Sequence, residues 1–198
     1  MNEKVIEITE VKQYPFIEGK NLTLCAPNKD NLNLYASWDN HPDARKYARN
    51  VFPTTAGDLK KYLERGQERA PREIGFEIWH KADCKPIGFI GFNFVNWADR
   101  MGNIGLNIGD PSYWKKDLGM EATYLILEYA FNELNLFKIT ADMYEMNTPS
   151  WKICEKVGMK RELTYMKQAY VKGNYVDTYQ YCLFKEDWEK QRQKFEFK

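Results

Sequence analysis

Apolar residues recur along this chain with two different periods, and the change from one period to the other predicts its elements. Alternation of apolar and polar residues is typical of strands, and apolar residues three or four apart are typical of helices. The alternating segments predict strands at 20–27, 74–80, 86–94, 102–109, 137–144, 159–170 and 175–184. The helical pattern predicts helices at 31–38, 55–68, 118–134 and 149–157, and a short one after Pro42. Polar segments between neighbouring strands predict hairpin turns at 81–85 and 172–174. This order predicts a mixed α/β fold.

The predicted helix at 118–134 is apolar nearly all round. Its polar residues Glu121, Glu128 and Asn132 line up as one narrow stripe. A helix with so little polar surface is expected to be largely buried in the core.

Capping residues support the predicted helix boundaries. Asn28 precedes the helix at 31–38, and asparagine is a favoured N-cap. Asn147 or Thr148 is expected to cap the last predicted helix, and Gly158 is expected to end it.

The totals narrow the class of protein. The chain has 198 residues, 43% of them hydrophobic, which is enough for one domain with a substantial core. Its 29 basic and 28 acidic residues nearly cancel, so we expect neither a nucleic acid nor a membrane as its partner. No apolar run is long enough to span a bilayer, and the N-terminus lacks the apolar core of a signal peptide. A soluble cytoplasmic protein is expected.

The potential metal ligands and disulfide partners are scattered. The four cysteines follow no paired spacing, and the two histidines, His41 and His80, are far apart in the sequence. We therefore expect no metal site and no disulfide, and we expect four reduced cysteines, most of them buried.

The most informative segment is 104–131, which reads as a strand, a turn at Asp110-Pro111, a basic loop ending at Gly119 and a long helix. A strand that leads through a basic loop into a helix directs unpaired N–H groups and the positive end of the helix dipole at one spot. Such a spot suits a phosphate group.

This segment and the one after it together resemble the acyl-coenzyme-A-binding core of the GNAT N-acetyltransferases. The likeness spans about 19–188 and is strongest after residue 86. It is closest to the branch that acetylates protein N-termini, polyamines and some antibiotics. The matching residues, in the order and spacing of the family, are Trp114, Gly119, Glu121-Ala122, Asn147 and Gly158.

The resemblance implies a domain layout and a fold. It implies an N-terminal extension at 1–18, a single GNAT domain at 19–190 and a C-terminal tail at 191–198. The fold would be a central mixed, mostly antiparallel sheet flanked by helices. Acetyl-CoA, the co-substrate, would lie between the parallel strands 102–109 and 137–144 where they splay apart. A homodimer is also possible for a protein of this kind.

The resemblance also implies which residues bind the coenzyme. In the family the pantetheine arm pairs with the first splayed strand, here at Ile108 and Gly109. Other positions matching the phosphate-binding loop and its surroundings are Trp114, Lys115, Lys116, Asp117, Leu118, Gly119, Met120, Asn147 and Ser150.

Asp117 occupies the position of the family's first loop glycine. A carboxylate beside a pyrophosphate is unfavourable unless its side chain caps the helix and turns away from the ligand. The alternative interpretation is that Asp117 is an ordinary N-cap and Gly119 an incidental helix residue.

Two residues are candidates for hydrogen-bonding the coenzyme A thiolate that leaves during acetyl transfer. The family's usual tyrosine is replaced by Cys154, whose S–H is a weak donor. Some members of this branch instead use a serine three residues after the asparagine, which corresponds to Ser150. We favour Ser150 as the catalytic donor, with Cys154 second. The alternatives are a buried filler for Cys154 and a first-turn helix serine for Ser150.

The amine must lose a proton before or during its attack, so the reaction needs a general base. The sequence identifies this base less well than it identifies the coenzyme-binding residues. Glu77, Asp110 and Glu145 are candidates, although each also suits a solvated or capping role. The expected acceptor loops are 41–55, 96–101 and 170–174.

Four aromatic residues, Trp38, Tyr47, Phe52 and Trp97, lie in or near the expected acceptor region. Core packing is the default interpretation for each of them. Exposed together, they would form an apolar acceptor pocket.

The function implied is N-acetyl transfer from acetyl-CoA to a primary amine of a protein N-terminus, a polyamine or a small molecule. A non-catalytic acyl-CoA-binding or regulatory protein on the same fold is the alternative. A protein that has lost coenzyme A altogether is the third hypothesis.

Overall fold

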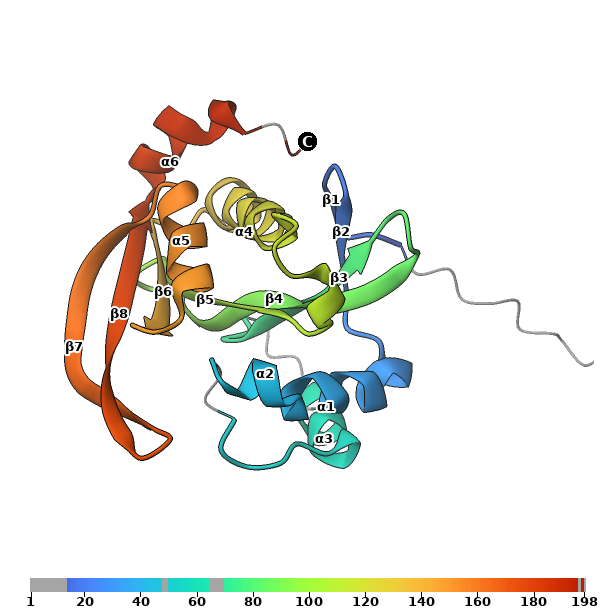
Figure 1. The fold of residues 1–198 in the computed structure, drawn as a ribbon. Coiled ribbons are helices and arrows are strands. Elements are labelled where there is room, and N and C mark those ends of the chain that lie inside the picture. The colour runs from blue at the N-terminus through green and yellow to red at the C-terminus, as the bar shows by residue number, and fades with distance from the viewer. Residues whose placement is uncertain (1–13, 48–49, 65–69, 196, 198) are drawn as a thin grey trace, which may run out of the picture.

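The computed structural model describes residues 14–47, 50–64, 70–195 and 197, and they form one eight-stranded sheet (Figure 1). The strand order is β1-β2-β3-β4-β5-β6-β8-β7, and β5 and β6 are its parallel pair. The strands are β1 (Ile17–Glu18), β2 (Leu22–Cys25), β3 (Ile74–His80), β4 (Lys85–Asn96), β5 (Met101–Ile108), β6 (Lys138–Tyr144), β7 (Lys160–Val171) and β8 (Asn174–Phe184). The predicted mixed, mostly antiparallel α/β architecture is confirmed.

Helices cover both faces of the sheet (Figure 1). On one face lie α4 (Leu118–Glu128) and α5 (Thr148–Lys156), and on the other lie α1 (Leu32–Asn40), α2 (Pro42–Arg45) and α3 (Ala56–Leu63). The last helix, α6 (Lys185–Gln191), follows β8. Single turns complete the chain at η1 (Lys29–Asn31), η2 (Pro111–Tyr113), η3 (Tyr129–Glu133) and η4 (Arg192–Lys194).

Most helix boundaries agree with the capping signals in the sequence. The Asn28 side chain accepts a hydrogen bond from the Asp30 amide, and the Asn147 side chain accepts one from the Ser150 amide. The helix predicted at 55–68 ends at Leu63, and most of its remaining residues (65–68) lie outside the described residues.

Helix α4 is buried as its sequence predicts. The two glutamates of its polar stripe, Glu121 and Glu128, are buried with it, whereas Asn132 is exposed in the following turn. Glu121 accepts hydrogen bonds from the amides of Asn21 (2.7 Å) and Leu22 (3.0 Å) at the start of β2. Glu128 accepts one from the Trp188 indole on α6 at 3.0 Å. Because buried carboxylates need such donors, the stripe connects α4 to both ends of the chain.

The helical run continues past α4 in a different geometry. Tyr129–Glu133 forms a π-helical turn, and the Leu134 amide donates to the Tyr129 carbonyl at 3.0 Å. The predicted helix at 118–134 is therefore nearly continuous, with a wider last turn.

The two expected terminal segments pack against the domain within the described residues. Phe16, in the predicted extension, lies 5.5 Å from the Phe76 ring, and Ile17–Glu18 forms β1. At the other end, Phe195 stacks on Trp188 at 6.0 Å, and the Phe197 carbonyl accepts from the Lys20 amide at 2.9 Å. Apolar residues on both sides of 19–190 therefore pack against the core.

Among the described residues, no helix is long and apolar enough to cross a membrane.

Candidate functional site

The parallel strands β5 and β6 splay apart along their length. Their pairing is confined to Met101–Lys138, Gly102–Ile139 and Asn103–Thr140, although β5 continues to Ile108 and β6 to Tyr144. At the point of divergence, the Asn103 side-chain amide donates to Thr140 Oγ1 (3.0 Å) and Asp142 Oδ2 (2.6 Å). Beyond this point the facing backbone edges of β5 and β6 are available to an extended ligand.

The loop between β5 and α4 contains two left-handed residues. Lys115 has a φ of 62° and Asp117 a φ of 55°. Glycine adopts this conformation most easily, whereas other residues adopt it at a cost. At Asp117 the backbone therefore has the left-handed conformation that glycine favours, although the residue is an aspartate.

Backbone donors are available where this loop enters α4. The N–H groups of Asp117, Leu118 and Gly119 have no hydrogen-bond partner within the described part of the chain, whereas the next amide, Met120, donates to the Asp117 carbonyl at 3.0 Å. Consecutive unpaired amides at a helix N-terminus suit an anion. Lys115 and Lys116, both exposed, add positive charge to the loop.

The alternative interpretation, that Asp117 is an ordinary N-cap of α4, is wrong. It makes no side-chain capping bond, and its carboxylate instead forms an ion pair with Lys156 Nζ on α5 at 3.2 Å. The left-handed backbone at Asp117 differs from the extended conformation that N-cap residues usually adopt. The pair partly neutralises the negative charge beside the open amides.

Gly119 is buried at the contact of α4 with its neighbours. A Cβ atom at this position would lie 3.0 Å from Ile153 Cδ1 and 3.2 Å from Leu106 Cδ2. The glycine thus permits close packing of α4 against α5 and β5, and it is not an incidental helix residue.

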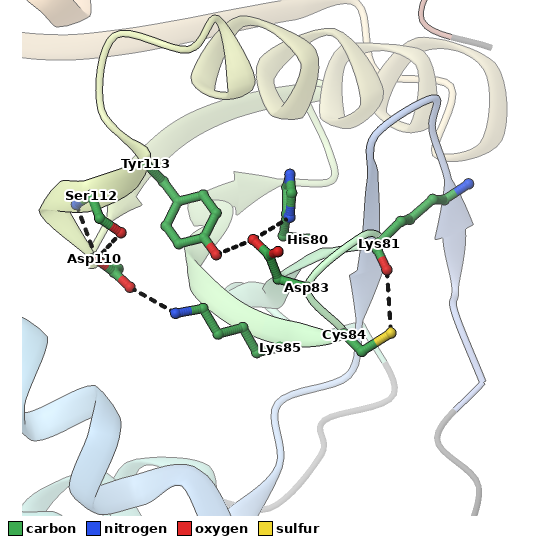
Figure 2. A network of polar contacts seen from close by, with 8 residues as sticks. All are labelled: His80, Lys81, Asp83, Cys84, Lys85, Asp110, Ser112 and Tyr113. Atoms are coloured by element: carbon green, nitrogen blue, oxygen red, sulfur yellow. Dashed lines mark hydrogen bonds and ion pairs between the residues drawn. The ribbon is translucent and has the colours of Figure 1, made fainter.

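The loop between β5 and α4 is anchored to the hairpin turn between β3 and β4 (Figure 2). The Tyr113 hydroxyl donates to Asp83 Oδ2, and His80 Nδ1 lies 2.9 Å from the same oxygen. The hydrogen bond from Tyr113 lowers the pKa of Asp83. Lys85 and Lys116 each place Nζ 5.0 Å from the centroid of the Tyr113 ring.

Asp110 and Trp114 fix the two sides of this anchored segment. Asp110 caps η2 by accepting from the Ser112 amide, and it accepts from Lys85 Nζ at 3.2 Å. The Trp114 indole donates to the carbonyl of Ile108, the last residue of β5, at 2.7 Å. These contacts hold the loop at the open end of the splayed pair.

Helix α5 begins beside the same opening. Asn147 is buried, and its side-chain oxygen accepts from the Ser150 amide at 3.4 Å. Ser150 is half-buried in the first turn, and Cys154 follows one turn later, only 5% exposed. Burial raises the pKa of the Cys154 thiol to about 12.

The three carboxylates considered as bases have different surroundings. Glu77 is fully buried under α1 and accepts from Asn31 Nδ2 (2.7 Å) and the Tyr35 hydroxyl. Asp110 has the capping role described above. Glu145 is exposed directly after β6, and its Oε1 accepts from the Asp177 amide at 3.4 Å.

A cleft of about 370 Å³ lies beyond the end of β6. It is lined by α2 and the segment after it, by Tyr144 of β6, and by the β7–β8 hairpin at Tyr170–Lys172. The structure thereby brings together two of the three expected acceptor loops, 41–55 and 170–174. It separates the third, because the Arg100 carbonyl at the β4–β5 turn accepts from the Phe137 amide (2.6 Å) before the opposite end of β6.

The four aromatic residues do not gather in this cleft. Trp38 is buried, packing against Tyr35 and Phe89, and Gly109 allows its close approach, since a Cβ there would lie 2.2 Å from Trp38 Cγ. Phe52 is 81% exposed. The aromatic lining comes instead from Tyr144 and Tyr170. Tyr170 begins the expected acceptor loop 170–174, whereas Tyr144 ends a predicted strand and was not a candidate.

The comparisons with known proteins agree with this geometry. Residues 21–160 match the family model described as acetyltransferase (GNAT) domain. The chain belongs to the GNAT acetyltransferase family.

Individual relatives extend the likeness. The chain is 40% identical over 112 residues to "uncharacterized N-acetyltransferase YnaD" of Bacillus subtilis, covering 56% of this chain and 64% of that protein. It is 27% identical over 177 residues to "uncharacterized N-acetyltransferase p20" of Bacillus licheniformis, covering 85% of this chain and 96% of the relative.

A solved structure of spermidine N-acetyltransferase from Vibrio cholerae, in complex with CoA and spermine, superposes with a TM-score of 0.78. The match covers 85% of this chain and 98% of the other at 20% identity, so it shows the shared fold.

Within the described residues, no group of three or more His, Cys, Asp or Glu side chains is arranged to hold a metal ion.

Proposed function

We propose that this protein transfers an acetyl group from acetyl-CoA to a primary amine. The observation that carries the proposal is the splayed β5–β6 pair, which opens directly toward the unpaired amides at the start of α4. In the reaction the amine nitrogen forms a bond to the thioester carbonyl carbon while the carbon–sulfur bond breaks. The amine loses one proton, and coenzyme A leaves as a thiolate that takes up a proton.

The residues around the splay fit acetyl-CoA, which would supply the activated thioester. Leu118, Gly119 and Met120 lie at the α4 N-terminus, where the open amides suit its pyrophosphate, with charge added by Lys115 and Lys116. The free β5 edge leading to Ile108 and Gly109 suits its pantetheine arm. Trp114 and Asn147 position the loop and α5 at the two sides of this opening.

We assign the thiolate contact to Ser150. Its hydroxyl is half-buried in the first turn of α5, and a hydroxyl donates a stronger hydrogen bond than a thiol. Cys154 is the weaker candidate, because an S–H is a weak donor and the side chain is only 5% exposed. Its burial suits packing.

We assign proton removal from the amine to Glu145 or to a water molecule that it orients. Of the three carboxylates considered, Glu145 is the exposed one at the end of β6, next in sequence to the cleft residue Tyr144. A base must reach the amine directly or through one water molecule.

The test is a thiol-release assay with acetyl-CoA and a panel of amines, combined with calorimetric titration of acetyl-CoA. We expect binding, and release of free thiol with at least one class of amine. Binding without thiol release for any amine would favour the non-catalytic alternative. The absence of both binding and thermal shift would favour a protein that has lost the coenzyme.

A further inference from the structure

The cleft beyond β6 carries a strong positive charge. Arg45 and Lys46 at the end of α2 and Lys172 at the tip of the β7–β8 hairpin line it, together with Tyr144 and Tyr170. No Asp or Glu is among the described residues that line it. Asp43 and Glu145 are next to lining segments in the sequence, but neither contributes to the wall of the cleft.

No described carboxylate neutralises these three cations. Across the described ranges, none of the three forms an ion pair with a carboxylate within 4.0 Å. By contrast, Lys85 and Lys156, which lie near the loop between β5 and α4, each have an acidic partner at 3.2 Å. The Arg45 Nε donates to the Asn50 carbonyl at 3.2 Å, a contact that orients the guanidinium and leaves its charge uncompensated.

The position of the cleft relates this charge to the reaction. Tyr144 is both the last residue of β6 and part of the cleft wall. Because β6 is one side of the splay, a molecule in the cleft lies at the same end of the sheet as the opening between β5 and β6. The helices α1 and α2 and the helix α4 lie on opposite faces of the sheet (Figure 1), so a second substrate has its own approach from the α2 side.

We infer that the acceptor is an amine that carries a carboxylate group close to its amino group, and that Arg45, Lys46 and Lys172 bind this carboxylate. The inference rests on the proposed acetyl transfer and names its acceptor class. An unneutralised cation attracts a carboxylate and repels a second cation within several ångströms. The same cleft therefore discriminates against polyamines, whose positive charges have no acidic partner in its lining.

The test compares acceptors that differ in charge. L-Aspartate, L-glutamate, a peptide beginning with two glutamates, a peptide beginning with two alanines, and spermidine are assayed at one acetyl-CoA concentration. We expect the highest kcat/KM for one of the three acidic acceptors, and the amino acids separate a small-molecule site from a peptide site. A preference for spermidine would overturn the inference and leave the acetyltransferase proposal intact.

A second test removes the three positive charges of the cleft by substitution. Arg45→Gln, Lys46→Gln and Lys172→Asn are combined, asparagine being chosen because Lys172 has a φ of 48°. We expect kcat/KM for the best acidic acceptor to fall by about tenfold or more, with an unchanged KM for acetyl-CoA. The control is Lys60→Gln on α3, an exposed lysine outside the cleft, which should change neither value. An equal loss with the neutral peptide would mean that the three cations do not select for charge.

A binding measurement keeps the two proposals distinguishable if no amine is acetylated. Such a result would overturn the proposed function. Calorimetric titration of L-glutamate and of spermidine into the protein saturated with coenzyme A would then still measure the charge preference. Tighter binding of spermidine, or binding of L-glutamate that is unaffected by the triple substitution, would contradict the acceptor assignment.

Discussion

At the scale of single residues, the backbone conformation of Lys115 and Asp117 defines the proposed coenzyme loop between β5 and α4 more clearly than their side chains do. Both residues are left-handed, and the charge of Asp117 is directed to Lys156. The ion pair is exposed, so it contributes at most about 1 kcal/mol to stability. The loop therefore tolerates an aspartate beside its open amides.

Replacing Asp117 by glycine should tighten acetyl-CoA binding. The change removes a negative charge and releases Lys156, and glycine accepts a φ of 55° without strain. We expect the Kd measured by calorimetry to fall by about two- to tenfold, on the order of one surface charge interaction.

Lys115→Gly is the matched control, because it relieves the same backbone conformation and removes a positive charge. Its Kd should rise. Weaker binding by the Asp117→Gly protein would mean that the Asp117–Lys156 pair organises the loop.

Ser150 and Cys154 should respond differently to truncation. Ser150→Ala should lower kcat by about ten- to a hundredfold with little change in the KM for acetyl-CoA, because one hydrogen bond to the leaving thiolate is lost. Cys154→Ala should affect thermal stability more than kcat, since the thiol is buried.

The substitution Cys154→Tyr restores the family's usual residue but is expected to destabilise the protein. At 5% exposure the site has little room, and overpacking costs about 1–3 kcal/mol or more. Kinetics and thermal unfolding of the three variants test this set. A larger loss of kcat for Cys154→Ala than for Ser150→Ala would reverse the roles.

At the scale of elements, helix α4 contributes most to the geometry of the candidate site. Its N-terminus supplies the open amides, and its Gly119 sets its distance from α5 and β5. The proposed coenzyme loop, between β5 and α4, and the proposed thiolate donor Ser150, on α5, are on separate elements. The packing at Gly119 determines how far apart those elements lie.

Gly119→Ala should destabilise the protein through its contact with Ile153. A Cβ 3.0 Å from Ile153 Cδ1 forces a displacement, which we expect to cost about 1–3 kcal/mol. Ile153→Val removes that methyl group and on its own should cost about 0.5–1.5 kcal/mol.

The double variant should therefore be more stable than the sum of the single effects predicts, by at least about 0.5 kcal/mol. Chemical unfolding of the four proteins measures this coupling. Strict additivity would show that the helix relaxes elsewhere and that the contact is not limiting.

At the scale of the whole molecule, residues near both ends of the described chain pack against the core. Phe195 packs on Trp188 and on Tyr124, whose ring centroid lies 5.5 Å away. Arg192 Nη2 also donates to the buried Glu128 carboxylate at 3.0 Å. The segment after α6 thus contributes to the surroundings of α4.

Phe195→Ala should lower the free energy of unfolding by about 2–3 kcal/mol, somewhat less than for a fully buried phenylalanine. Phe52→Ala is the control, because Phe52 is 81% exposed and its loss should change stability by less than about 0.5 kcal/mol. Thermal unfolding compares the two. Equal effects would mean that Phe195 adds nothing to the core and would favour the predicted C-terminal tail at 191–198.

The sequence by itself determined the elements, the burial of α4 and the family. Each of these depends on local patterns: the period of the apolar residues, the caps at Asn28 and Asn147, and the order of Trp114, Gly119 and Asn147. The same local information predicted the splayed strands only through the resemblance, and it left the acceptor loops as three separate segments.

Only the tertiary structure decided how distant residues meet. Lys156 and Asp117, or Arg45 and Lys172, have no relation in the sequence, and strand pairing and helix packing alone bring them together. The antiparallel β4–β5 hairpin likewise moved 96–101 away from the cleft. Long-range contacts of this kind depend on the register of the whole sheet, which no short segment of sequence specifies.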